Sequence, residues 1–196
     1  MTGLVILDLG YGNTRSVAQA FERLGAEPRL TADPGVAAAA QRLVLPGVGA
    51  ARSAMDALRR SRVDQVVIER TRPTLGICLG MQLMFERSEE DGGSQLLSLL
   101  PGLVTALAQS PRAPVPNMGW CALEDVGPDL GLSDGDQLYF AHSFVCTDGP
   151  ATAARARHGD RLFPAALRDG PRWGAQFHPE RSSAAGARFL SAFLKS

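Results

Sequence analysis

The chain has 196 residues, 45% of them hydrophobic, and its 20 basic and 20 acidic residues give a formal net charge of zero. This length favours a single domain, residues 1–196. The balanced charge, with no basic run, gives no sign of binding to nucleic acid or to an acidic membrane surface. The three cysteines, Cys78, Cys121 and Cys146, form neither a metal-binding spacing nor a disulfide framework, so we expect a reducing, cytoplasmic compartment.

The first half of the chain alternates between short apolar runs and helical patterns. The run Leu4–Leu7 predicts a buried strand directly at the N-terminus, and we expect no signal peptide and no membrane span. A turn at residues 10–13 leads to a helix that begins near Asn13 and ends at Gly25. Arg15 stands where a dinucleotide-binding fingerprint needs its third glycine, which excludes that motif.

Further strands are predicted at residues 28–31, 43–45 and 73–77, with one or two helices between residues 53 and 69. Alternation of strands and helices is typical of a parallel sheet covered on both faces. The second half differs, because short strand patterns follow one another between Gly, Asp and Pro turns; they lie at residues 103–107, 138–145, 152–157, 165–168 and 173–177. Ser182 or Ser183 is expected to cap a last helix. The fold class is therefore α/β, with a mixed, mostly parallel central sheet flanked by helices and a small antiparallel extension.

The segment from Thr74 to Gln82 carries the strongest chemical signal. A short apolar strand ends at Cys78, which has Gly76 and Gly80 two residues to either side. Such a turn presents a thiol on a sharp strand-to-helix bend that leaves no room for Cβ atoms. The following helix directs its free N–H groups at the sulfur and favours the thiolate.

His178-Pro179-Glu180 supplies the groups that a thiol nucleophile needs. Proline disfavours the helical region for the preceding residue, so we expect His178 to be extended and Glu180 to lie on the same side of the chain. The carboxylate would then fix the imidazole tautomer, leaving the other ring nitrogen to take the thiol proton. Taken alone, a cysteine or histidine is usually structural, and we interpret Cys121, Cys146, His142 and His158 in that way.

Acyl transfer also needs donors for a developing oxyanion. The N–H of Leu79, next to the nucleophile, is one candidate. The strand-ending Pro46-Gly47-Val48-Gly49 is the other, because its glycines allow a peptide N–H, at Val48 or Gly49, to turn toward the site.

These motifs together resemble the class I (triad-type) glutamine amidotransferases. Within that group the chain is similar to the family of glutaminase subunits of imidazole glycerol phosphate synthase, and the resemblance spans nearly the whole chain. The segments that carry it are residues 8–13, 45–50, 76–82, 116–120, 139–144 and 176–182. It implies that Cys78 attacks the side-chain amide of glutamine, that His178 moves the proton, and that Glu180 holds His178.

The resemblance further implies that Gln82, Ser143 and Gly49 help to hold glutamine. It implies no metal and no organic cofactor. Ammonia would pass to a partner, the cyclase subunit, in a heterodimer of histidine biosynthesis, and docking would complete the oxyanion hole near Val48. Our candidates for the docking face are Asn13, Trp120 and Arg181, with ordinary core as the alternative for Trp120.

Four positions depart from the family pattern, and none belongs to the triad: Arg181, Asn117, Phe144 and Ala51. Three alternatives remain open. The first is the glutaminase subunit of another ammonia-channelling synthase, such as that of vitamin B6. The second is a stand-alone cysteine hydrolase of the same fold, and the third is a non-catalytic binding module.

Overall fold

The computed structural model describes residues 3–10, 13–111 and 113–196. Its helices are α1 (Thr14–Glu22), α2 (Pro34–Ala39), α3 (Ala51–Ser61), α4 (Val63–Glu69), α5 (Leu79–Gln82) and α6 (Ser183–Lys195), with 3-10 turns η1 (Glu90–Gly92) and η2 (Pro179–Arg181). Its strands are β1 (Leu4–Leu7), β2 (Pro28–Thr31), β3 (Arg42–Leu45), β4 (Thr74–Ile77), β5 (Arg87–Ser88), β6 (Ser94–Gln95), β7 (Leu103–Ala106), β8 (Asn117–Glu124), β9 (Gln137–His142), β10 (Phe144–Cys146), β11 (Thr152–His158), β12 (Arg161–Asp169) and β13 (Arg172–Ala175).

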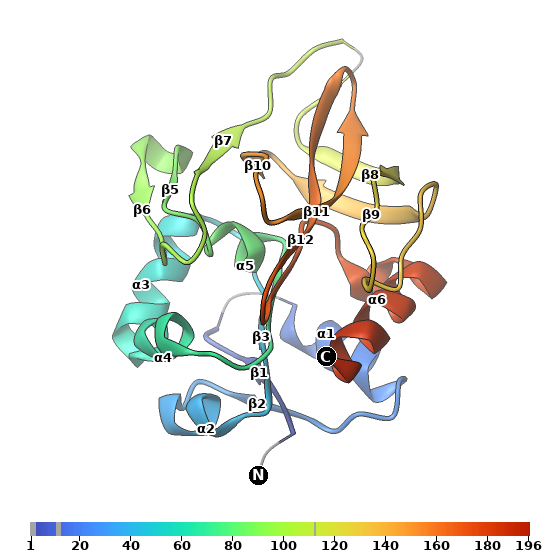
Figure 1. Cartoon of the computed structure of the whole chain (residues 1–196). Helices are drawn as coiled ribbons and strands as arrows, with labels where there is room; N and C mark the ends of the chain where they lie inside the picture. The colour runs from blue at the N-terminus through green and yellow to red at the C-terminus, as the bar shows by residue number, and fades with distance from the viewer. Residues whose placement is uncertain (1–2, 11–12, 112) are drawn as a thin grey trace.

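The central sheet has nine strands in the order β2-β1-β3-β4-β13-β12-β11-β8-β9 (Figure 1). The pairings from β2 to β13 are parallel, and those from β13 to β9 are antiparallel. A second, four-stranded sheet has the order β10-β7-β5-β6. The expected mixed α/β architecture is therefore present.

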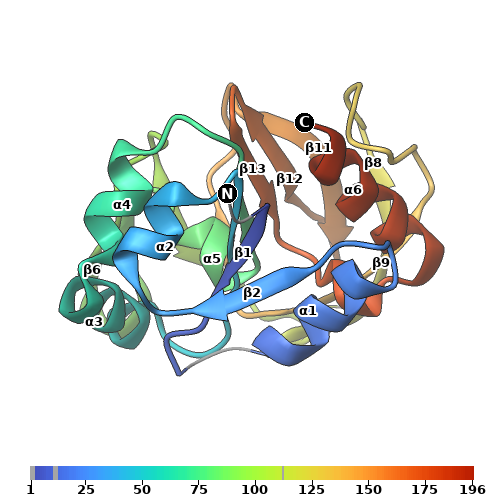
Figure 2. The same ribbon diagram turned by 90° about the horizontal axis from the view of Figure 1, so that it is seen from below.

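Two apolar cores lie on opposite faces of the parallel strands. Successive residues of a strand point to opposite faces, so Leu4 and Ile6 pack with α1 and α6, whereas Val5 and Leu7 pack with α2, α3 and α4. Figure 2 shows this layering, with α1 and α6 on one side of the sheet and α2, α3 and α4 on the other. The full burial of β1 explains why it is a continuous apolar run.

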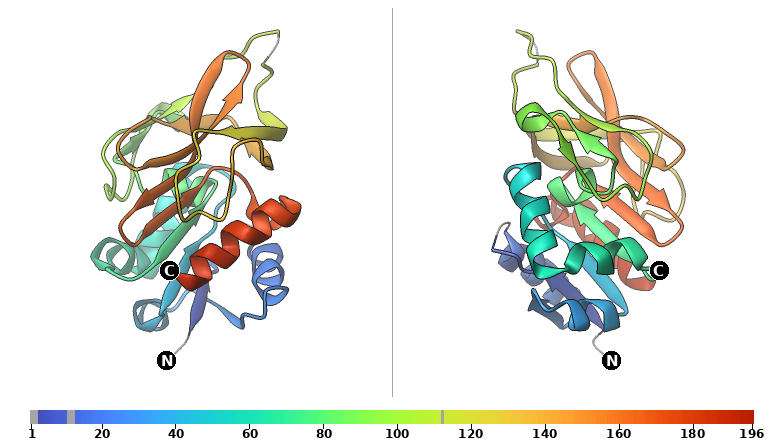
Figure 3. Two further views of the ribbon diagram at one scale, coloured as in Figure 1. Left: turned by 45° about the vertical axis from the view of Figure 1, so that its right-hand side comes forward. Right: turned by 90° about the vertical axis from the view of Figure 1, so that its left-hand side faces the viewer.

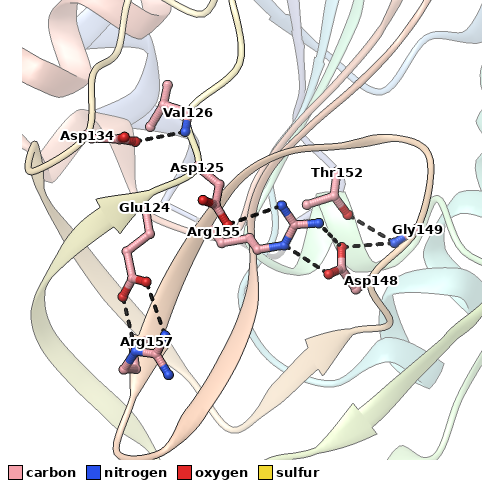
Figure 4. Close-up of polar contacts among 9 residues, drawn as sticks. All are labelled: Glu124, Asp125, Val126, Asp134, Asp148, Gly149, Thr152, Arg155 and Arg157. Atoms are coloured by element: carbon pink, nitrogen blue, oxygen red, sulfur yellow. Dashed lines mark hydrogen bonds and ion pairs between the residues drawn. The ribbon is translucent and has the colours of Figure 1, made fainter.

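The antiparallel strands extend away from the end of the molecule at which the N-terminus lies (Figure 3). Exposed ion pairs join β11 to its surroundings (Figure 4): Arg155 binds both carboxylate oxygens of Asp148 at 2.9 Å, and Arg157 binds Glu124 at 3.1 Å. Each exposed pair of this kind stabilises a fold by about 0–1 kcal/mol, so they contribute more to local geometry than to stability.

Several elements differ from the sequence-based prediction. Of the one or two helices expected between residues 53 and 69, the structure has two, α3 and α4, separated at Arg62, which has a left-handed φ of 58°; α3 begins two residues earlier than expected, at Ala51. The strand predicted at residues 138–145 is two strands, β9 and β10, which belong to different sheets. Helix α2 and strand β8 were not predicted. The turn expected at residues 10–13 includes positions 11 and 12, which lie outside the described residues, whereas Asn13 caps α1 as expected and accepts a hydrogen bond from Ser16 N at 3.3 Å.

Candidate active site

Cys78 lies on a strained turn between β4 and α5. Its backbone has φ 52° and ψ −110°, a conformation that residues other than glycine rarely adopt. Glycine is required nearby, because a Cβ on Gly80 would lie 1.8 Å from Leu45 O, and a Cβ on Gly76 would lie 2.5 Å from Gly80 O. The expectation that this bend has no room for Cβ atoms is confirmed.

Parallel pairing of β4 with β13 brings the two distant motifs together. Ala175 pairs with Ile77, and Cys78 N donates to Ala175 O at 2.6 Å. The chain from β13 then reaches His178, whose φ of −99° and ψ of 95° are extended, as predicted. The sheet therefore closes the long sequence separation between the cysteine and the histidine.

His178 and Glu180 are buried and hydrogen-bonded to each other. His178 Nδ1 lies 2.9 Å from Glu180 Oε1, and the side chains are only 9% and 2% exposed. The prediction assumed that the chain stays extended through Glu180, but Pro179–Arg181 form the 3-10 turn η2, which brings the carboxylate to the ring by a tighter path. The second carboxylate oxygen, Glu180 Oε2, is buried and finds no partner among the described residues.

Ser182 fixes the backbone around the histidine instead of capping α6. Its hydroxyl donates to His178 O at 2.7 Å and accepts from Tyr139 N at 2.9 Å. It occupies the N-cap position of α6 without making a side-chain cap bond, so the predicted capping role is wrong. The hydroxyl is thus directed at His178 O and Tyr139 N and away from the end of the helix.

The electrostatics of the site favour a protonated imidazole. Burial alone would lower the pKa of His178, but its hydrogen-bonding and charge interactions with Cys78 and Glu180 outweigh burial and raise that pKa to about 10. An imidazolium between a sulfur and a carboxylate is the arrangement in which a thiol is activated as a nucleophile. The sulfur has two further polar neighbours: Ala141 O at 3.8 Å, to which only the protonated thiol can donate, and Gln176 Nε2 at 3.7 Å, which donates to the sulfur.

Cys78 opens onto a cavity of about 280 Å³. This cavity collects all the residues that the sequence nominated for the oxyanion hole and for the substrate: Val48, Gly49, Leu79, Gln82 and Ser143. Gln82 Nε2 donates to Phe144 O at 2.9 Å and to Gln176 Oε1 at 3.0 Å, so the amide oxygen of Gln82 is the group left for a ligand.

Three further polar side chains belong to the site and were missed. Glu90 lines the cavity and accepts a hydrogen bond from Ala51 N at 2.6 Å, at the start of α3. Gln176, which is fully buried, touches the sulfur. His142, which we interpreted as structural, also lines the cavity. The sequence gives no local pattern for these residues. Glu90 lies on the short 3-10 turn η1, and Gln176 and His142 are buried side chains.

The three candidate docking residues lie outside this cavity. Trp120 on β8 is 52% exposed, and its neighbour Met118 is 65% exposed, so core is excluded for Trp120. The Trp120 ring meets Tyr139 edge-on at 6.0 Å, and the Arg181 guanidinium lies 4.6 Å from the centre of the same Tyr139 ring. Asn13 lies at the start of α1, and that helix packs against η2.

Within residues 3–10, 13–111 and 113–196, no three His, Cys, Asp or Glu side chains are grouped to hold a metal ion. In the same part of the chain, no helix is long and apolar enough to cross a membrane.

Comparison with known proteins gives a consistent picture. The family model described as "Glutamine amidotransferase class-I" matches residues 5–196. The protein named imidazole glycerol phosphate synthase subunit HisH of Xanthomonas axonopodis pv. citri is 43% identical over 198 residues, covering 100% of this chain and 98% of its own length. The protein of the same name from Escherichia coli K12 is 43% identical over 195 residues and covers 98% of both chains.

Solved structures share the fold at lower sequence identity. A crystal structure of a glutamine amidotransferase superposes with a TM-score of 0.76 at 20% identity, covering 98% of each chain. The structure of PurLQS from Thermotoga maritima gives a TM-score of 0.66 at 17% identity, covering 100% of this chain and 99% of that one. At such identities the likeness supports the fold alone.

Proposed function

This chain belongs to the class I glutamine amidotransferase family, and we propose that it is the glutaminase subunit of imidazole glycerol phosphate synthase. In this role it hydrolyses glutamine to glutamate and ammonia and passes the ammonia to a cyclase subunit in histidine biosynthesis. The observation that carries the proposal is the meeting of Cys78, His178 and Glu180 beside a cavity that opens onto the sulfur. The identity of the relatives over their full length points to this synthase.

The reaction begins with attack by sulfur on an amide carbon. The Cys78 thiolate forms a bond to the side-chain carbonyl carbon of glutamine, and the carbonyl electrons move to oxygen. The N–H of Leu79, at the start of α5, and a peptide N–H of the Val48–Gly49 segment are the proposed donors to this oxyanion, and all three residues line the cavity. Losing one such donor costs about 3–4 kcal/mol in the transition state.

Collapse of the tetrahedral intermediate breaks the carbon–nitrogen bond. The His178 imidazolium gives its proton to the departing nitrogen, which leaves as ammonia, and a glutamyl thioester remains on Cys78. His178 then takes a proton from water as the water attacks the thioester, and glutamate leaves while the thiol is restored. Glu180 holds Nδ1 throughout and stabilises the charged ring. These steps consume only glutamine and water.

Glutamine is held by groups that surround the sulfur. The Gln82 oxygen accepts from a substrate N–H or ammonium group, and Ser143 and Gly49 contact the same ligand. Glu90, which has a carboxylate at the cavity wall, is a suitable partner for the α-ammonium group of glutamine. We expect these groups to act together on binding, with their loss appearing mainly in KM.

The partner is the cyclase subunit, which docks on the face formed by Asn13, Trp120 and Arg181. Exposed Trp and Arg side chains are the residues most often responsible for binding energy in interfaces, and here they share the Tyr139 ring. Docking turns the peptide near Val48, which is 43% exposed, to complete the oxyanion hole. The chain works as one domain in the cytoplasm.

The test is glutamate release by the purified chain, alone and with the cyclase subunit bound to its own ligand. A marked increase with the liganded cyclase supports the proposal, and equal rates contradict the control by docking. Turnover without any cyclase would favour a stand-alone hydrolase, and activation only by a different synthase would favour the vitamin B6 alternative. No adduct at Cys78 with a glutamine-analogue electrophile would favour a binding module.

The variant Cys78→Ala separates the two roles within the complex. Glutamine-dependent synthesis should disappear, while synthesis from added ammonia should continue, because the cyclase needs only ammonia. Loss of both activities in a folded complex would contradict the division of labour.

A further inference from the structure

A buried chain of hydrogen bonds runs from strand β8 to the nucleophilic sulfur. It begins at Asn117, whose side-chain amide lies 3.1 Å from His142 Nε2. His142 Nδ1 lies 2.9 Å from Phe144 O. A carbonyl oxygen only accepts, so the ring proton is on Nδ1, and Nε2 is left to accept from the Asn117 amide nitrogen. Burial lowers the pKa of His142 to about 4, which keeps the ring neutral at pH 7 in agreement with this tautomer.

The chain continues from the same carbonyl oxygen to Cys78. Phe144 O also accepts from Gln82 Nε2, and Gln82 Nε2 donates in turn to Gln176 Oε1 at 3.0 Å. The Gln176 oxygen is thereby occupied, which directs its Nε2 to the sulfur at 3.7 Å. The four linking side chains are nearly inaccessible to water, with exposures of 3%, 6%, 6% and 0% for Asn117, His142, Gln82 and Gln176.

Each link in this chain has a defined polarity, and none can exchange freely with water. In a dry environment a hydrogen bond is electrostatically stronger, and a misdirected polar group is costly. An N–H group that donates to sulfur favours the thiolate over the thiol. The orientation of one amide, that of Gln176, therefore bears directly on the reactive form of Cys78.

We infer that Gln176 is a positioning residue that holds the Cys78 sulfur as a thiolate, and that Phe144 O, acting through Gln82, fixes the direction of the Gln176 amide. This inference rests on the proposed function, because it concerns the same nucleophile. The hydrogen-bonded branch that contains Asn117 begins on β8, next to the exposed Met118 and Trp120, and meets the branch to the sulfur at the backbone carbonyl of Phe144.

The pH dependence of Cys78 alkylation by iodoacetamide tests the inference without glutamine or cyclase. The reaction is followed on the peptide that contains Cys78, because Cys121 and Cys146 are also free. Other titratable groups face the sulfur or its partner: His178 and Glu180 beside it, Cys146 on β10, His142 on β9, and Glu90 at the cavity wall. All of them remain in the variants, so a difference from the wild-type profile reports on the substituted amide.

Gln176→Met keeps the volume and removes both hydrogen bonds. We expect the midpoint of its alkylation profile to rise by about one pH unit, as for loss of one hydrogen bond to a charged group. With liganded cyclase, kcat should fall about tenfold while KM stays within about twofold, since the interaction is made to the nucleophile and not to glutamine. The matched control is Gln65→Met on the exposed surface of α4, which should leave the midpoint unchanged.

Gln82→Met removes the donor that occupies Gln176 Oε1 and serves if Gln176→Met does not fold. It should raise the midpoint in the same direction by a smaller amount. Wild-type midpoints for both variants would overturn the inference, and a wild-type midpoint for Gln82→Met alone would overturn the part that assigns the direction of the Gln176 amide to Gln82. Because the midpoint is read without substrate or partner, a chain that shows the shift but releases no glutamate with liganded cyclase would refute the proposed function and leave this inference standing.

Discussion

Replacing Glu180 by glutamine tests how the carboxylate supports His178. Glu180→Gln keeps the shape of the side chain and can present its amide oxygen to His178 Nδ1, which now lies 2.9 Å from Glu180 Oε1. The tautomer is then preserved, and only the negative charge is lost. A hydrogen bond to a charged group is stronger than a neutral one by about 1–2 kcal/mol, which corresponds to a roughly 5- to 30-fold lower kcat/KM.

The substitution has a second consequence, for stability. The new amide nitrogen takes the place of Glu180 Oε2, which is buried without a partner among the described residues. An unpaired buried N–H group costs about 1–3 kcal/mol, but the unpaired carboxylate oxygen that it replaces carries a similar cost, so this exchange should change the unfolding free energy by less than about 1 kcal/mol. The pKa of His178, now raised to about 10 with the help of Glu180, should fall as well.

The assay is glutamate release in the complex with liganded cyclase, measured across pH, together with urea unfolding of the chain. Glu124→Gln is the control, because Glu124 is 41% exposed and pairs with the surface residue Arg157; its kcat/KM should stay within about twofold of wild type. If Glu180→Gln also stays within about twofold, with an unchanged pH profile, the carboxylate does not stabilise the imidazolium and the reasoning is wrong.

Three further predictions concern packing, protonation and docking. Gly80→Ala places a Cβ 1.8 Å from Leu45 O and should lower the urea midpoint of unfolding sharply or abolish folding. In the control Gly149→Ala the added Cβ has no other atom within 4 Å, so the midpoint should change little. Equal midpoints for the two variants would contradict the packing argument. The pKa of His142 in the folded chain is about 4, below the usual 6.5. Between these two pH values the unfolded chain therefore binds more protons than the folded chain, and the unfolding free energy should drop by about 3 kcal/mol as pH falls from 6.5 to 4. If His142→Gln shows the same pH dependence of the unfolding free energy, another group is responsible. Trp120→Ala should weaken cyclase binding at least about tenfold in a titration, while its unfolding free energy stays within about 1 kcal/mol of wild type. The control is Leu30→Ala on β2, the strand at the far edge of the sheet, which should bind the cyclase with wild-type affinity. Wild-type affinity for Trp120→Ala would remove Trp120 from the interface.

Local sequence patterns were sufficient where the local environment decides the structure. The run Leu4–Leu7 is apolar on both faces because helices cover both faces of β1, and the predicted strand has the observed bounds. Helix α2 was missed although its signals are local: Pro34 is in the first turn, and the Asp33 side chain accepts from Val36 N at 2.9 Å. Its six residues are too few to give a clear helical period.

Other features depend on contacts that no local pattern contains. The break between β9 and β10 at Ser143 separates two sheets, although the residues on both sides favour strands. Ser182 has the chemistry of a helix cap, but the distant Tyr139 N takes up its oxygen. The Cys78 and His178 motifs were recognisable because glycines flank the cysteine and a proline follows the histidine directly in the sequence. Gln176 has no such local signal, because its hydrogen-bond partner Gln82 lies 94 residues away.

The most direct test of the account is mass spectrometry of the complex, quenched in acid during turnover of glutamine. If Cys78 is the nucleophile and His178 the proton carrier, the peptide that contains Cys78 will carry a glutamyl group, and the adduct will be absent in Cys78→Ala. Continued release of glutamate with no adduct on that peptide, or with full activity retained in Cys78→Ala, would contradict the central claim.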